Sequence, residues 1–150
     1  MSTDPTNLNV DFMILADGAQ AVGGKLYMLG GGWDRLLVPK LPGPPQAPYS
    51  VAVAINVPYS MTNRRFGFAL QLVNADGDPL GDTFTVEFEA GRPPGMRPGS
   101  KQAILLAANT RPDFPAPGMY SYNASIDGEP LRSVSFEVVL QTPGPQPRPE

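Results

Sequence analysis

The chain has 150 residues, a mass of 16.0 kDa and a net charge of −3, from 11 basic and 14 acidic residues. This length suits one domain with a single sizeable core. Charged residues are only 17% of the chain and form no basic stripe, so we expect no nucleic-acid partner. Histidine and cysteine are absent, which excludes imidazole bases, thiolate nucleophiles, disulfides and nearly every zinc site.

Catalysis by a pair of carboxylates needs neither residue type and stays open on composition alone. The acidic residues fall mostly in turns or on polar strand faces, however, so the sequence predicts a protein that is not an enzyme. We expect no catalytic residue, no bound metal and no cofactor.

The N-terminal stretch MSTDPTNLN has no apolar core, and no apolar run approaches 18 residues. The sequence therefore predicts neither a signal peptide nor a transmembrane segment, and no membrane partner. We expect a cytoplasmic or virion-associated protein. Its predicted organisation is a flexible N-terminus over 1–8, a β-sandwich domain over 9–140 and a proline-rich extended tail over 141–150.

Apolar residues alternate with polar ones in most segments of the domain, the pattern of half-buried β-strands. The first two segments, Val10–Ala16 and Lys25–Leu29, are apolar on both faces, and we expect them to be the more deeply buried. The second is predicted to continue to Val38 as one long strand. Six further strands are predicted around Val51–Val57, Phe66–Leu72, Phe84–Phe88, Gln102–Asn109, Tyr120–Ile126 and Val134–Leu140.

Turn signals separate these strands. Asn74–Gly81 and Ile126–Leu131 each contain Asp-Gly and predict hairpin turns. The acidic residues after Asn74 also alternate as in a calcium loop, but no bidentate glutamate closes the series, which favours a turn. Proline-rich linkers are predicted over 39–48 and 90–101.

The segment PGMYSY, from Pro117 to Tyr122, resembles the tyrosine corner of immunoglobulin-like domains. Tyr120 would bond back to the upstream backbone, and Tyr122 would take the place of the usual cysteine. Because half-polar strands suit antiparallel sheets with one wet face, we predict an all-β fold. Its architecture would be an antiparallel two-sheet, immunoglobulin-like Greek-key sandwich of about eight strands.

The stretch LGGGWDRL, Leu29 to Leu36, has two interpretations. In the first, the glycines expose backbone N–H groups beside an aromatic platform, and Trp33, Asp34 and Arg35 bind a sugar, an anion or a peptide. In the second, the glycines only bend a strand, Trp33 enters the core, and the Asp-Arg pair ties the bend to a neighbouring strand. No helix follows to form a phosphate cradle, and we favour the structural interpretation.

The segment Phe12–Leu36 resembles the opening of a family of uncharacterised bacterial and phage-borne proteins with an LAD…GKLYxLGGGWD signature. Leu15–Asp17, Gly24–Asp34, the Pro117-Gly118-x-Tyr120 motif and Asp127-Gly128 carry this resemblance. Tyr122 stands where the family more often has phenylalanine. The resemblance implies a sandwich fold and assigns no activity.

We therefore expect a non-enzymatic structural or interaction module, an accessory or decoration component of a larger assembly such as a phage particle. Its partner would be another protein or a second copy of the chain. The interaction positions would be Arg92 and Arg97 in the loop and Arg148 in the tail. The alternative is a soluble ligand- or carbohydrate-binding sandwich with its site near Trp33.

Overall fold

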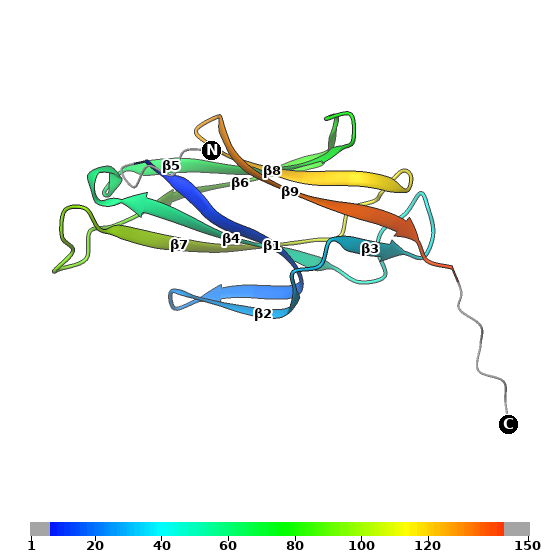
Figure 1. Ribbon diagram of the computed structural model, residues 1–150, viewed down its shortest axis with the longest axis horizontal. Helices are drawn as coiled ribbons and strands as arrows, with labels where there is room; N and C mark the ends of the chain where they lie inside the picture. The colour runs from blue at the N-terminus through cyan, green and yellow to red at the C-terminus, as the bar shows by residue number, and fades with distance from the viewer. Residues whose placement is uncertain (1–6, 143–150) are drawn as a thin grey trace, which may run out of the picture.

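The computed structural model describes residues 7–142, which form a sandwich of two β-sheets (Figure 1). Sheet A has the strand order β2 (Lys25–Gly31), β1 (Asn9–Val22), β4 (Tyr49–Pro58), β7 (Lys101–Thr110). Sheet B has the order β3 (Arg35–Val38), β9 (Glu129–Leu140), β8 (Gly118–Ile126), β5 (Arg65–Asn74), β6 (Pro79–Glu89). A short 3-10 turn, η1 (Tyr59–Met61), is the one helical element of the described residues. The prediction of an all-β sandwich is confirmed.

Both predicted hairpin turns are present. Between β8 and β9, Asp127 and Gly128 have φ of 51° and 84°, the positive values that a two-residue type I′ turn needs. Between β5 and β6, the Asn74 side-chain oxygen accepts hydrogen bonds from the backbone N–H groups of Asp76 (3.0 Å) and Asp78 (2.9 Å). This oxygen therefore closes the turn.

The immunoglobulin-like features lie at β8. The Tyr120 hydroxyl donates a hydrogen bond to the carbonyl of Ala116 (2.6 Å), which is the predicted tyrosine corner. Two residues later, Tyr122 points inward, and its hydroxyl lies 2.5 Å from that of Tyr49 on β4 of the opposite sheet. A pair of phenols thus links the sheets where an immunoglobulin domain has its disulfide. The order β1-β4-β7 facing β9-β8-β5 matches that fold.

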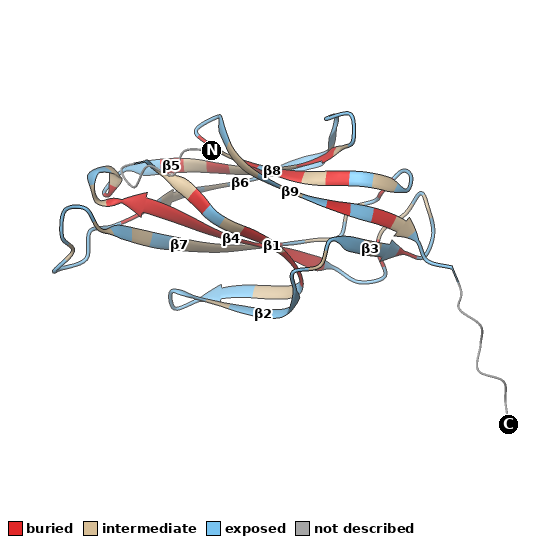
Figure 2. Cartoon of the chain, in the orientation of Figure 1, coloured by how far each residue is buried: buried red, intermediate tan, exposed pale blue. Residues whose placement is uncertain are grey.

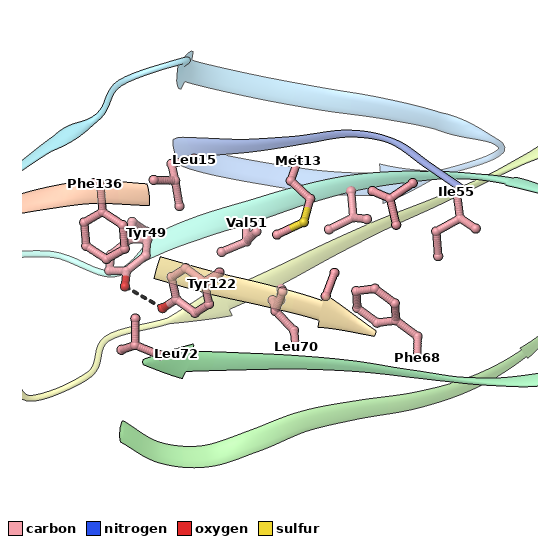
Figure 3. Packing of buried hydrophobic residues seen from close by; sticks show 14 of the residues in the cluster. Met13, Leu15, Tyr49, Val51, Ile55, Phe68, Leu70, Leu72, Tyr122 and Phe136 are labelled. Carbon is pink, nitrogen blue, oxygen red and sulfur yellow. Dashed lines mark hydrogen bonds between the residues drawn. The ribbon is translucent and has the colours of Figure 1, made fainter. Parts of the chain in front are cut away.

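The core lies between the two sheets, and β4 is buried along its whole length (Figure 2). On its inner face, Val51 and Ile55 point toward Phe68 and the other apolar residues of sheet B (Figure 3). On its outer face, Ala52 and Ala54 are also covered. The cover on this side is the hairpin formed by the second half of β1 and β2, which folds back beneath sheet A in Figure 1.

Two expectations about the chain before Val38 are wrong. The stretch 25–38 is two strands in different sheets, because Gly32 and the two residues after it carry the chain from sheet A to sheet B. There β3 pairs in parallel with β9, so sheet B is not wholly antiparallel. The split raises the number of strands from the expected eight to nine.

Burial also departs from the sequence pattern at two edges. The segment Lys25–Leu29 is mostly exposed, although it is apolar on both faces, because β2 is the edge strand of sheet A and belongs to the hairpin on the outer side of that sheet. On β6, Phe84 is 41% exposed, although alternation places it inward, because β6 is the edge strand of sheet B.

Candidate functional site

The glycines of LGGGWDRL shape the crossing between the sheets. Gly30 has φ of 58°, and a Cβ atom there would lie 2.4 Å from a carboxylate oxygen of Asp17. Gly32 has φ of 93°, and its N–H donates to the carbonyl of Leu15 (2.8 Å). Only a residue without a side chain adopts such conformations at little cost. Both glycines therefore serve the bend, and the N–H of Gly32 is already hydrogen-bonded to Leu15.

Trp33 lies at the end of this crossing, half-buried against the core. Its ring packs edge-to-face on Tyr49 (centroids 5.5 Å apart) and on Phe136 (6.3 Å). Its indole nitrogen is buried and has no hydrogen-bond partner among residues 7–142. Two aromatic neighbours thus hold the ring in place, which favours a structural role of Trp33 over a stacking platform for a sugar.

Asp34 and Arg35 fasten β3 to β9. The carbonyl of Asp34 accepts a hydrogen bond from the N–H of Glu137 (2.8 Å). The Arg35 guanidinium lies 3.5 Å from the Glu137 carboxylate, and both side chains are about half exposed or more. The contacts of Trp33, Asp34 and Arg35 thus serve the neighbouring strand and the core, as in the structural interpretation.

The arginines proposed as docking positions differ from one another. Arg92 is held in place: its Nε donates to the Thr62 hydroxyl (2.9 Å), and its guanidinium lies 3.8 Å from the centre of the Tyr59 ring. Arg97 is exposed, and its carbonyl accepts a hydrogen bond from the N–H of Ser100 (3.1 Å). Arg148 and the tail from 143 onward lie outside the described residues, as do residues 1–6 of the N-terminus.

The buried phenol pair is the perturbed titratable group of the core. Burial raises the pKa of the Tyr122 hydroxyl to about 12, although hydrogen bonds with Tyr49 and Thr110 lower it in part. Burial, followed by the proximity of Tyr122, raises the pKa of Tyr49 still further. Both groups are neutral at physiological pH and serve the core as hydrogen-bonding groups. Residues 7–142 hold no group of three acidic, histidine or cysteine side chains placed to bind a metal.

The largest departure from a closed sandwich is the β1–β2 hairpin (Figure 1). Its inner face lies on the outside of sheet A: the N–H of Ala19 donates to the Ser50 hydroxyl (3.0 Å). The Ile14 side chain and the Met28 sulfur also both lie within 4 Å of the position that a Cβ atom of Gly31 would take. Its outer face carries three exposed apolar residues, named here the hairpin patch: Val22, Tyr27, Leu29.

Sequence reasoning missed this hairpin, although a signal was present. Gly23-Gly24 separates two strand-like runs by two residues, and both glycines have positive φ, 59° and 76°. Such a pair is a common type I′ hairpin turn. The apolar character of Lys25–Leu29 indicated a buried strand, whereas the structure leaves β2 at the open edge of sheet A.

Three chains of solved structures resemble this chain, and two of them are described below. One is the alkylpurine DNA glycosylase AlkC of Pseudomonas fluorescens, bound to DNA containing an abasic site analogue, with 13% identity and a TM-score of 0.45. The match covers 87% of this chain and 30% of that one, so the chain spans under a third of the glycosylase's length. The other is a CARDB domain from Pyrococcus furiosus in complex with di-metal ions. It has 17% identity and a TM-score of 0.43, and the match covers 94% and 99% of the two chains.

Likenesses this distant bear on neither binding nor activity. Among curated proteins, none matches the chain. Residues 11–139 match the model of a family of unknown function, DUF6941. The described residues contain no helix that is long and apolar enough to cross a membrane.

Proposed function

The chain belongs to the DUF6941 family of unknown function, and we propose from its own geometry that it is a homotypic assembly module. The observation that carries this proposal is the exposed apolar hairpin. Val22 is 51% exposed, Tyr27 58% and Leu29 77%, and all three lie on one face of the β1–β2 hairpin, with Tyr27 and Leu29 on the edge strand β2. Natural sheets rarely leave an apolar edge uncovered, because it adds readily to another strand.

A second copy of the chain is the partner that β2 fits best. Around a two-fold axis at Met28, two β2 strands can pair antiparallel, as isologous dimers require. Tyr27 of one copy then lies opposite Leu29 of the other, an aromatic–aliphatic pair of the kind that stabilises sheets. Lys25 lies opposite Gly31, so no like charges meet. The two A sheets become one continuous sheet.

Such a dimer would act as an accessory or decoration part of a larger assembly, such as a phage particle, which is the role we propose for it. The alternative of a ligand site at Trp33 has weaker support. The ring of Trp33 packs against Tyr49 and Phe136, and the next two residues, Asp34 and Arg35, contact Glu137 of β9.

Light scattering tests the proposal directly. The chain should have about twice its mass of 16.0 kDa. Leu29→Lys should give a monomer, because it places a charge in the apolar interface. Leu37→Lys is the matched control: Leu37 is also half exposed, but it lies on β3, at the edge of the other sheet, and the dimer should persist. A wild-type monomer, or equal effects of the two substitutions, would refute the proposal.

The register can be tested by pairing two defective variants. Tyr27→Lys and Leu29→Glu should each be monomeric alone. Mixed together, they should form a heterodimer, because the new lysine of one copy faces the new glutamate of the other. Recovery should weaken as salt screens the charge pair. If the mixture stays monomeric, β2 strands do not pair about Met28.

A further inference from the structure

A cavity of about 340 Å³ opens between the two sheets at the side formed by their edge strands, β6 of sheet B and β7 of sheet A. Its walls come from both layers: Val51 and Ala108 from sheet A, Leu70 and Leu72 from sheet B. Phe84 stands at its mouth, and Tyr122 lines its inner end. The volume lies at the small end of the range typical of small-molecule pockets.

The cavity results from how β6 is built. Leu80 pairs with Leu72 and Phe84 with Leu70, so Gly81–Thr83 forms a bulge opposite the single residue Gln71. The Gln71 amide donates to the carbonyl of Leu80 (3.2 Å), and the Thr83 hydroxyl donates to the Gln71 side-chain oxygen. These bonds fix the bulge from outside the sandwich. The bulge is therefore held by hydrogen bonds of the chain itself.

Exposed Phe84 follows from this arrangement. Its place in the alternation is a core position, yet Phe84 is 41% exposed because it lies on the edge strand β6 and lines the cavity together with the small residue Ala108 of the other sheet. An occupant of the cavity would cover that ring. The removal of the aromatic ring and the aliphatic walls from water would contribute favourably to the free energy of binding.

The polar groups restrict what can bind. The Tyr122 hydroxyl already forms hydrogen bonds with Tyr49 and Thr110, so a bound molecule does not need to supply a hydrogen-bonding group for it. Among the described residues that line the cavity, Asp82 is the only charged one. It disfavours a carboxylate or sulfonate and tolerates an amine. A bulge also protects a strand edge against pairing, which argues against an added peptide strand at this point of β6.

We infer that the cavity between β6 and β7 binds a small apolar molecule that carries no negative charge. This site is separate from the hairpin patch and goes beyond the proposed assembly role. It also differs from a site at Trp33, although Trp33 contacts Tyr49, whose hydroxyl reaches Tyr122 at the inner end of the cavity. The chain's single tryptophan therefore lies close enough to report on an occupant.

The test uses the uncharged dye N-phenyl-1-naphthylamine. Its fluorescence should rise to saturation on titration with the full chain, while Trp33 emission falls by energy transfer. Ala108→Met should weaken dye binding by about tenfold, equivalent to about 1.4 kcal/mol, because the longer side chain fills the cavity. Ala107→Met is the matched control: Ala107 pairs with Ala52 on the outer face of sheet A, and the affinity should not change.

Charge selectivity is checked with the sulfonated analogue 8-anilino-1-naphthalenesulfonate. It should bind more weakly than the neutral dye, and Asp82→Asn should narrow that difference. Should Ala108→Met fail to fold by circular dichroism, Phe84→Ser at the exposed mouth replaces it and should also weaken binding.

Three outcomes would overturn the inference. The first is no saturable binding of the neutral dye. The second is an equal loss of affinity in Ala107→Met and Ala108→Met, or no loss in the folded cavity variant. The third is loss of binding in Leu29→Lys, which would place the dye on the hairpin patch. A failure of dimerisation by the wild-type chain would leave these results unaffected.

Discussion

Trp33 anchors the crossing between the sheets through its ring and not through a polar bond. Its edge-to-face contacts with Tyr49 and Phe136 are favourable beyond the area they bury. Its indole N–H, in contrast, is buried without a partner among the described residues, which costs free energy. The two effects oppose each other, and they can be separated by substitution.

Trp33→Ala should lower the free energy of unfolding by about 3 kcal/mol, the low end of the range for large aromatic residues, because Trp33 is only half-buried. Trp33→Phe should cost about half as much or less, since it keeps an aromatic edge contact and removes the unpaired N–H. Urea denaturation followed by circular dichroism gives both values. A cost below about 1 kcal/mol for alanine would mean that the ring is not part of the fold.

The phenol pair predicts alkaline lability. The pKa of Tyr122 is about 12 in the folded chain, that of Tyr49 is higher, and both are near 10 when unfolded. Folding thus favours the neutral phenols. The contribution of Tyr122 is complete below pH 10 and is lost as the pH rises from 10 through 12, and that of Tyr49 is still being lost above pH 12, because the unfolded chain ionises first. The slope approaches about 1.4 kcal/mol per pH unit for each tyrosine.

Tyr122→Phe removes one of the two ionisable groups. We expect the free energy of unfolding of this variant to fall less steeply with pH than that of the wild type. Urea denaturation between pH 9 and pH 12, the upper limit being the pKa of Tyr122 in the folded chain, measures both slopes. The difference between the two curves separates the contribution of the Tyr49–Tyr122 pair from other alkaline effects. Parallel curves would show that Tyr122 is not protected from ionisation.

At the level of elements, the β1–β2 hairpin depends on an irregularity at its base. The ladder steps from the Ala16–Gly31 pair to the Gly18–Leu29 pair, which leaves Asp17 and Gly30 side by side. The strands bend there and bring the hairpin back over sheet A. The direction in which the hairpin patch faces therefore depends on the positive φ of Gly30 at this bend.

Gly30→Ala should destabilise the chain by about 1–2 kcal/mol, because its φ of 58° is strained for alanine and the new Cβ would meet Asp17. Gly18→Ala, one pair away on the same hairpin, has no heavy atom within 4 Å of its Cβ position and should be nearly neutral. Thermal unfolding compares the two variants. If both lose the same stability, Gly30 carries no special constraint.

Local features of the fold could be predicted from the sequence, and distant pairings could not. The Asp127-Gly128 turn and the Tyr120 corner depend on neighbours within a few residues, so their motifs predict them. The parallel pairing of Arg35 with Glu137 joins residues 102 positions apart. No local pattern reports such a contact. The exposure of Leu29 was missed for the same reason, since period-two alternation identifies a strand face but not whether another layer covers it.

The candidate sites follow the same division. Trp33 packs on core residues and Asp34 and Arg35 contact β9, as the structural interpretation expected, but the single bent strand of that interpretation is replaced by a crossing between two sheets. The cavity beside Phe84 requires the bulge at Gly81–Thr83 and a small residue on a strand of the other sheet, a combination visible only after folding.

At the scale of the whole molecule, the sandwich is held by contacts that are distant in sequence. β4 joins β1 and β7, and β9 joins β3, across long intervening segments. Closing such loops costs entropy before the contacts form, so β-sandwiches fold slowly. Stopped-flow refolding from urea should show a main phase in the range of about a millisecond to a second. A microsecond main phase would contradict this dependence on distant contacts.

The parallel β3–β9 pairing also affects how the molecule resists a pulling force. In Figure 1, β1 begins toward one end of the long axis, whereas β9 ends at the other. Tension applied through these two strands runs along them, and β9 is flanked by β3 on one side and β8 on the other. The hydrogen bonds on both sides of β9 are then loaded in shear together instead of opening one after another. Because resistance to pulling depends on the rate of forced unfolding, this clamp would let the domain carry load along its length.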